Sequence, residues 1–157
     1  MKPNLALSLR QPWADFVLYF GKHVENRTWN FHNRGEFWIH AAKGMTKSEY
    51  EDAMMMLEEV TGCPLEKAEL LMSMERGGIV GRARLVGVEM PRTHKLHGIG
   101  RVAAEAEHLR VDWRWHFPDQ YGFVLADVVS VPFVPCKGYF GFFPLPDDVV
   151  EKLKRAA

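Results

Sequence analysis

The sequence predicts an α+β fold built on a small mixed or antiparallel, barrel-like β-sheet with flanking helices. Strand-type segments dominate both ends of the chain, while apolar residues at helical spacing are concentrated in its middle. No internal repeat or low-complexity linker divides the 157 residues, a length that suits one domain with a sizeable core. We therefore expect a single domain over residues 1–157, with a helical insertion at about 46–74.

The first elements alternate between strand and helix. We expect residues 6–10 to form a short strand. A helix then begins with Pro12 in its first turn, where backbone N–H groups make no hydrogen bond within the helix and the N–H that proline lacks is not needed. Apolar residues recur at helical spacing as far as Phe20. We expect two further strands, over 23–29 and 36–42, joined by a polar loop.

The pattern then changes to helical spacing. Apolar residues form one stripe from Thr46 to about Val60, and Thr46 with Glu49 has the spacing of a capping box. Gly62-Cys63-Pro64 interrupts this pattern, and a second helix is predicted over 65–74. These two helices make up the insertion.

The last third of the chain returns to strands and ends in a helix. We predict a strand over 78–90, an irregular stretch over 91–120 with a short helix near 101–108, a strand over 121–134, a Gly- and aromatic-rich segment over 136–146 and a helix over 147–155. Pro132 lies inside a predicted strand, which indicates a sheet edge or a bulge there.

Composition limits the classes of function. The formal net charge is zero, whereas proteins that coat duplex nucleic acid carry a basic surplus. No apolar run is long enough to span a bilayer, and the N-terminal segment has no signal-peptide pattern. We expect a cytoplasmic protein without a membrane partner, in which Cys63 and Cys136 are free thiols.

Common catalytic motifs are missing from the sequence. It contains no CxxC pair, P-loop, GxSxG or HExxH, so zinc-ribbon, nucleoside-triphosphatase, lipase-like and zinc-peptidase functions have no support. His94 and His97 are a weak metal pair, because no cysteine or carboxylate follows at a matching spacing. We expect neither a metal site nor a cofactor.

The strand predicted over residues 23–29 carries an acidic, a basic and an aromatic side chain on one face. Alternation along a strand places Glu25, Arg27 and Trp29 on one face. A solvated face with a surface ion pair explains this pattern equally well. The closeness of Trp29 to Trp13 and Trp38 in the sequence favours a ligand cleft instead, because aromatic walls with a few convergent charges are typical of small-ligand sites.

Three further polar residues lie at element ends near this strand. Lys22 occupies the helix–strand junction, and Lys43 follows the strand predicted over 36–42. His40, inside that strand, is expected to be half-buried and hydrogen-bonded. Aromatic residues with lysine and arginine nearby suit stacked bases plus a phosphate.

The order of six segments resembles the ASCH domain family over residues 5–146. The segments are LSLRQPWA, GKHVENRTW, GEFWIHAAK, GGIVGRARL, QYGFVLADV and PCKGYFGFFPLP. The resemblance implies a PUA-like β-barrel with flanking helices and a cleft between the first helix and the barrel. On the wall of that cleft, a GxKxxExR-like segment corresponds to Lys22, Glu25 and Arg27, and the helix start contributes Gln11, Pro12 and Trp13.

The resemblance also implies a function. ASCH domains are generally proposed to bind RNA or modified nucleotides, so the expected partner is single-stranded RNA or a modified nucleoside or nucleotide. The cleft would be formed by residues 11–13, 22–29 and 40–43. The expected ligand-binding residues are Gln11, Pro12, Trp13, Arg27, Trp29, His40 and Lys43.

Two other functions remain open. The first is a hydrolase that uses the same cleft, with Lys22 and Glu25 as catalytic residues. It would be an amidohydrolase on an acylated cytidine, although Glu25 stands where that group has a threonine. Alternatively it would be a metal-independent ribonuclease, with Glu25 or His40 as the base, Lys22 or Lys43 as the acid and Arg27 as the cation that stabilises the phosphorane. The second is a protein-interaction module whose cleft takes a peptide, so a protein partner is an open alternative.

Overall fold

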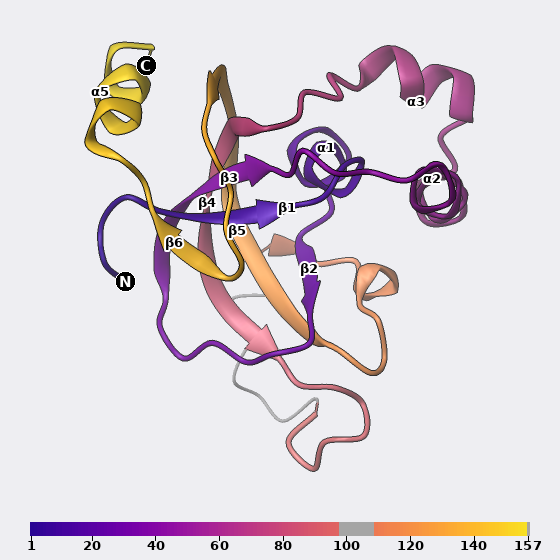
Figure 1. Cartoon of the computed structure of the whole chain (residues 1–157). Coiled ribbons are helices and arrows are strands. Elements are labelled where there is room, and N and C mark those ends of the chain that lie inside the picture. Colours follow the sequence, from indigo (N-terminus) through magenta and orange to yellow (C-terminus); the bar gives the residue numbers. More distant parts are fainter. Residues whose placement is uncertain (98–108, 157) are drawn as a thin grey trace.

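A mixed six-stranded sheet curls into a half-barrel in the computed structural model, which describes residues 1–97 and 109–156 (Figure 1). The strands are β1 (Leu5–Leu9), β2 (Val24–Arg27), β3 (Gly35–Ala41), β4 (Gly78–Glu89), β5 (Tyr121–Pro135) and β6 (Phe142–Pro144). Their order is β2-β5-β4-β3-β1-β6; β1 pairs with β3 in parallel, and the other neighbours are antiparallel. The predicted α+β, PUA-like fold is confirmed.

Helices flank this half-barrel on two sides (Figure 1). The described residues form α1 (Trp13–Tyr19), α2 (Lys47–Thr61), α3 (Leu65–Leu71), α5 (Asp147–Ala156) and a 3-10 turn, η1 (Trp113–Trp115). The helices α1, α2 and α3 lie at one end of the molecule, and α5 lies at the other. The side chains of α5 pack on Ala6, Ile79 and Val134 in the sheet.

The main core fills the inside of the half-barrel. Leu7, Ile39, Leu85 and Phe123 come from four different strands and are all completely buried, and α1 adds Val17 to the same cluster. Burying each large apolar side chain stabilises the fold by about 1.5–3 kcal/mol. The inward side chains of β1 are therefore apolar, whereas Ser8, between two inward leucines, faces outward.

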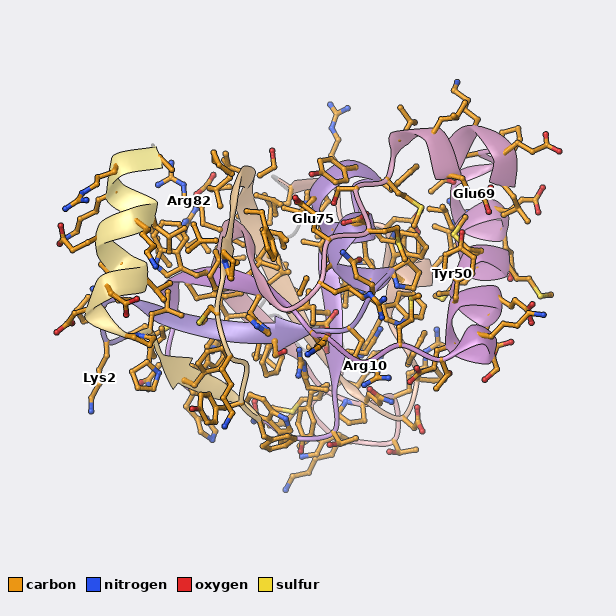
Figure 2. All side chains as sticks on the ribbon, turned by 45° about the horizontal axis from the view of Figure 1, so that its top comes forward. Lys2, Arg10, Tyr50, Glu69, Glu75 and Arg82 are labelled. Atoms are coloured by element: carbon orange, nitrogen blue, oxygen red, sulfur yellow. The ribbon has the colours of Figure 1, made fainter. Side chains whose placement is uncertain are left out.

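The insertion is a helical hairpin whose ends follow from its sequence. The capping box is present, with Thr46 accepting from the backbone N–H of Glu49 and Glu49 accepting from that of Thr46. Gly62 ends α2 in the left-handed region at φ 70°, which a glycine adopts without strain. Tyr50 on α2 donates a 3.0 Å hydrogen bond to Glu69 on α3, which joins the two helices (Figure 2).

Several predicted boundaries need adjustment. The strand expected over 23–29 is paired only along β2, and the helix expected to reach residue 74 ends at Leu71. The bulge indicated by Pro132 is confirmed, because the β4–β5 register jumps from Val134 to Ser130. The short helix expected near 101–108 lies outside the described residues. In the part of the chain that the structure describes, no helix has both the length and the apolar character of a membrane span.

Candidate functional site

Lys22, just before β2, and Glu25 and Arg27 within it form a charged network along this strand. Lys22 Nζ lies 2.9 Å from Glu25 Oε2 and donates a 2.6 Å hydrogen bond to the carbonyl oxygen of Val24. The other carboxylate oxygen of Glu25 lies 3.2 Å from Arg27 Nη2. Lys22 is only 1% exposed and Glu25 only 8% exposed, so this group is an internal ion network and not a solvated strand face.

Burial and charge act against each other in this network. Burial lowers the pKa of the Lys22 ammonium, and the contact with Glu25 offsets this effect only in part. Burial also acts to raise the pKa of Glu25, but the attraction of Lys22 and Arg27 outweighs it and holds that pKa below its ordinary value. The carboxylate of Glu25 therefore keeps two cations in place.

Arg27 connects this network to the opposite side of the half-barrel. Its Nη2 donates a 2.7 Å hydrogen bond to the main-chain oxygen of Ser8 on β1. That oxygen is accessible because β6 pairs with residues Leu5–Leu7 and stops before Ser8. The buried Nε of Arg27 has no hydrogen-bond partner among residues 1–97 and 109–156, so the guanidinium keeps one unused donor.

The side chain of Ser8 takes part in a second network, on the outer face of β1 and β3. Ser8 Oγ lies 2.9 Å from Nδ1 of His40, and Nε2 of His40 lies 2.8 Å from the carbonyl oxygen of Cys136. His40 is 2% exposed, and burial lowers its pKa more than the hydrogen bond to Cys136 raises it. The ring is therefore neutral at neutral pH.

A pocket of about 480 Å³ lies over this second network, and we call it the Ser8–His40 pocket. Its volume falls within the range of roughly 300–1,000 Å³ that is usual for small-ligand sites. Its lining residues are Ser8, His40, Ala42, Lys43, Gly77, Cys136, Lys137, Gly138, Tyr139 and Phe140. The site thus combines two lysines, a serine and a histidine with two aromatic rings.

The aromatic side of this pocket is unusually open. Phe140 is 85% exposed and Tyr139 is 55% exposed, whereas large apolar side chains are generally buried. Lys137 Nζ lies 5.2 Å from the centre of the Tyr139 ring, a cation–π distance. The loop between β5 and β6 therefore presents two flat rings and a positive charge to solvent.

A much smaller pocket lies where the sequence predicted the cleft, between the start of α1 and β2. Its volume is about 70 Å³, and its lining residues are Trp13, Lys22, Glu25, Asn26, Phe117 and Gln120. Lys22 Nζ lies 5.4 Å from the centre of the Trp13 ring. This volume is far below the range of small-ligand sites, so a base does not fit without movement of Trp13 or Phe117.

Two of the predicted site residues support the start of α1. Gln11 is 1% exposed, and its Nε2 donates 2.9 Å hydrogen bonds to Asp15 Oδ1 and to the carbonyl oxygen of Glu75. Pro12 is buried as well and follows a cis peptide bond. Both residues pack inside the fold and line neither pocket.

Trp29 lines neither pocket but lies beside the loop that carries Phe140. Its ring makes an edge contact with Phe123 at 5.1 Å and lies 6.1 Å from the ring of Phe140. The structure therefore separates the predicted cleft residues: Trp13, Lys22 and Glu25 line the small pocket, His40 and Lys43 line the Ser8–His40 pocket, and Arg27 links the two networks.

Sequence reasoning did not select Ser8 or residues 137–140 as site residues. Ser8 carries a weak signal, because it is a polar residue between two inward leucines of one strand. Residues 137–140 carry a stronger signal, since exposed tyrosine and phenylalanine beside lysine suit stacking on bases. Within the described residues, no group of three or more metal-binding side chains occurs.

Comparisons with known proteins point to one family. The model of the ASCH domain matches residues 7–131 of this chain. A crystal structure of a tyrosine-to-phenylalanine mutant of ZmASCH from Zymomonas mobilis is similar at 12% identity, with a TM-score of 0.52 and 98% of each chain covered. A serine-to-alanine mutant of the same protein gives 13% identity and a TM-score of 0.50, covering 96% of this chain and 94% of that chain. These likenesses concern the fold alone, and a search among curated proteins finds no match.

Proposed function

The chain belongs to the ASCH domain family, and we propose that it binds a nucleotide, or a short single-stranded RNA segment, in the Ser8–His40 pocket. The observation that carries the proposal is the make-up of this pocket, about 480 Å³ with Lys43, Lys137 and two exposed aromatic rings on its walls. This location uses the His40–Lys43 part of the predicted cleft and adds the loop between β5 and β6.

Each half of a nucleotide has a matching group in this pocket. A phosphate is attracted by Lys43 and Lys137, which position the nucleic acid without reading its sequence. A base stacks on Tyr139 or Phe140, and such stacking contributes about 1–3 kcal/mol per base. Ser8 lines the pocket, where its hydroxyl can accept a hydrogen bond from the ligand.

The zero net charge of the chain indicates a short contact with RNA. If Lys43 and Lys137 each neutralise one phosphate, log K should fall with log salt at a slope of about −1.4, from about −0.7 per phosphate for single strands. A protein with a long phosphate footprint would give a much steeper slope. The expected ligand is therefore one or a few nucleotides.

Hydrolysis by Lys22 and Glu25, as an amidohydrolase or a ribonuclease, is our second choice. Both side chains line the 70 Å³ pocket, but Lys22 is 1% exposed and its ammonium already contacts Glu25 and the Val24 carbonyl. A substrate would have to displace those contacts. If the wild-type protein hydrolyses an acylated cytidine or RNA, and a folded Lys22→Ala variant does not, this function would be favoured over binding alone.

Fluorescence anisotropy of a short labelled single-stranded RNA tests the proposal. The protein that tests the pocket carries Lys43→Ala and Lys137→Ala, and the matched control carries Lys152→Ala and Lys154→Ala on α5, neither of which lines the pocket. We expect weaker binding and a shallower salt slope only in the pocket double mutant. Equal affinity in both double mutants would refute binding in this pocket.

A further inference from the structure

Ser8 and His40 make a contact whose polarity is fixed by its surroundings. Nε2 of His40 faces the carbonyl oxygen of Cys136 at 2.8 Å, and a carbonyl oxygen can only accept, so Nε2 carries the ring proton. Nδ1 of the neutral ring must then accept, and its partner at 2.9 Å is the hydroxyl of Ser8. The Ser8 proton points at His40, and the lone pairs of Ser8 Oγ remain free.

Of the two residues, the nucleophile candidate Ser8 is the more accessible to a ligand. His40 is 2% exposed, and its ring lies directly beneath Gly138, where an added Cβ would collide with the imidazole. Ser8 is half-buried and lines the Ser8–His40 pocket, so a ligand in the pocket can reach it. Burial lowers the pKa of His40, which leaves the ring free to take a proton at neutral pH.

We propose that the Ser8–His40 pocket has a hydrolytic activity toward small carboxylic esters, with Ser8 as nucleophile and His40 as general base. A nucleophile, a base and a group that orients the base, here the carbonyl of Cys136, lie within hydrogen-bond reach of one another. Lys43 and Lys137 line the same pocket and supply positive charge for the oxygen that becomes negative during attack. This activity goes beyond nucleotide binding and does not depend on it.

The reaction needs water and no other co-reactant. Ser8 Oγ forms a bond to the carbonyl carbon of the ester while its proton moves to Nδ1 of His40, and the carbonyl π electrons move to the oxygen. The tetrahedral intermediate then expels the alcohol oxygen, which takes the proton from Nδ1. Water then attacks the acyl-serine and gives its proton to Nδ1 of His40. Ser8 Oγ leaves and takes that proton back, which releases the carboxylic acid and restores the hydroxyl of Ser8.

The first test is covalent labelling of the wild-type protein with a fluorophosphonate, followed by peptide mass spectrometry. The proposal predicts a phosphonyl adduct on the peptide that contains Ser8, because this serine is polarised by His40. Absence of an adduct on Ser8 would overturn the proposal. This test needs no variant and so does not depend on whether a variant folds.

The second test is hydrolysis of 4-nitrophenyl acetate by the full chain, without nucleotide. The comparison is between Ser8→Ala and Ser130→Ala, an exposed serine of β5 outside the pocket, with circular dichroism as the check on folding. We expect Ser8→Ala to lower the rate by about 100-fold or more and Ser130→Ala to retain it. A folded Ser8→Ala protein with the wild-type rate would overturn the proposal, whereas weak RNA binding alone would overturn only the proposed function.

Discussion

Arg27 on β2 donates a 2.7 Å hydrogen bond to the main-chain oxygen of Ser8 on β1, although these two strands are not neighbours in the sheet. The contact joins two sides of the half-barrel where β6 has stopped pairing with β1. One side of the junction is the ion network of Lys22 and Glu25, and the other is the Ser8–His40 pocket. The charged network along β2 thus contacts β1, the strand whose Ser8 lines the pocket.

Glu25→Gln should destabilise the fold strongly. The substitution removes the carboxylate that holds Lys22 and Arg27, and breaking a buried ion pair from one side costs about 3–5 kcal/mol. Asp148→Asn, which breaks an exposed pair with Lys152, is the control and should change stability by less than about 0.5 kcal/mol. Urea unfolding measures both, and equal stability of the two variants would mean that the β2 network is not stabilising.

Phe140→Ala should weaken nucleic-acid binding without unfolding the protein, because the ring is 85% exposed. Loss of one stacking contact, about 1–3 kcal/mol, corresponds to an affinity decrease of about 5- to 150-fold. Leu70→Ala, an 86% exposed position on α3, is the matched control and should bind RNA as the wild type does. The same loss in both variants would show that Phe140 has no specific role.

Gly138→Ala tests the close packing of the pocket loop on His40. A Cβ at this position would collide with the His40 ring, so the loop or the ring must move, at a cost of about 1–3 kcal/mol. At Gly44 a Cβ would come within 3.3 Å of only the flexible end of Arg10, so Gly44→Ala should be nearly neutral. Thermal unfolding compares them, and an unchanged Tm for Gly138→Ala would contradict the described loop position.

The titration of Glu49 at acid pH tests the contact between Arg10, directly after β1, and α2. Arg10 Nη2 lies 2.7 Å from Glu49 Oε2, and hydrogen bonds from Arg10 and Thr46 lower the pKa of Glu49 to about 2. A pKa lower in the folded state than in the unfolded state means that Glu49 stabilises the fold above its unfolded pKa of about 4.3 and loses this effect as the pH falls toward 2. Carboxyl NMR titration should give a midpoint near 2 for the wild type.

Arg10→Ala is the comparison for this titration. Removing the guanidinium removes the largest cause of the low pKa, so the Glu49 midpoint should move up toward its ordinary value. The capping-box contacts with Thr46 remain in this variant and should keep part of the shift. An unchanged midpoint would mean that Arg10 and Glu49 do not pair in solution.

Local signals in the sequence predicted the fold well. The capping box at Thr46, the break at Gly62 and the bulge near Pro132 each depend on neighbouring residues, and all three occur in the structure. The order of strands and helices predicted a barrel-like sheet, and the family resemblance added its PUA-like form. Neither predicted the strand order, which depends on contacts between distant segments.

The arrangement of the site could not be predicted in the same way. The bond from Arg27 to Ser8 depends on how far the sheet curls, which alternation along one strand does not specify. Lys22 is buried because Trp13 and Phe117, from separate parts of the chain, close over it. Local sequence could therefore show that charges and indoles gather near β2, but not that the roomier pocket opens beside His40.

The most direct test of the central claim is an NMR titration of the 15N-labelled protein with each of the four ribonucleoside monophosphates. Binding in the Ser8–His40 pocket predicts the largest amide shifts at Ser8, His40 and residues 137–140. It also predicts smaller shifts at Asn26 and Gln120 in the pocket beside Lys22. Shifts confined to those two residues, or no shift with any of the nucleotides, would contradict the account.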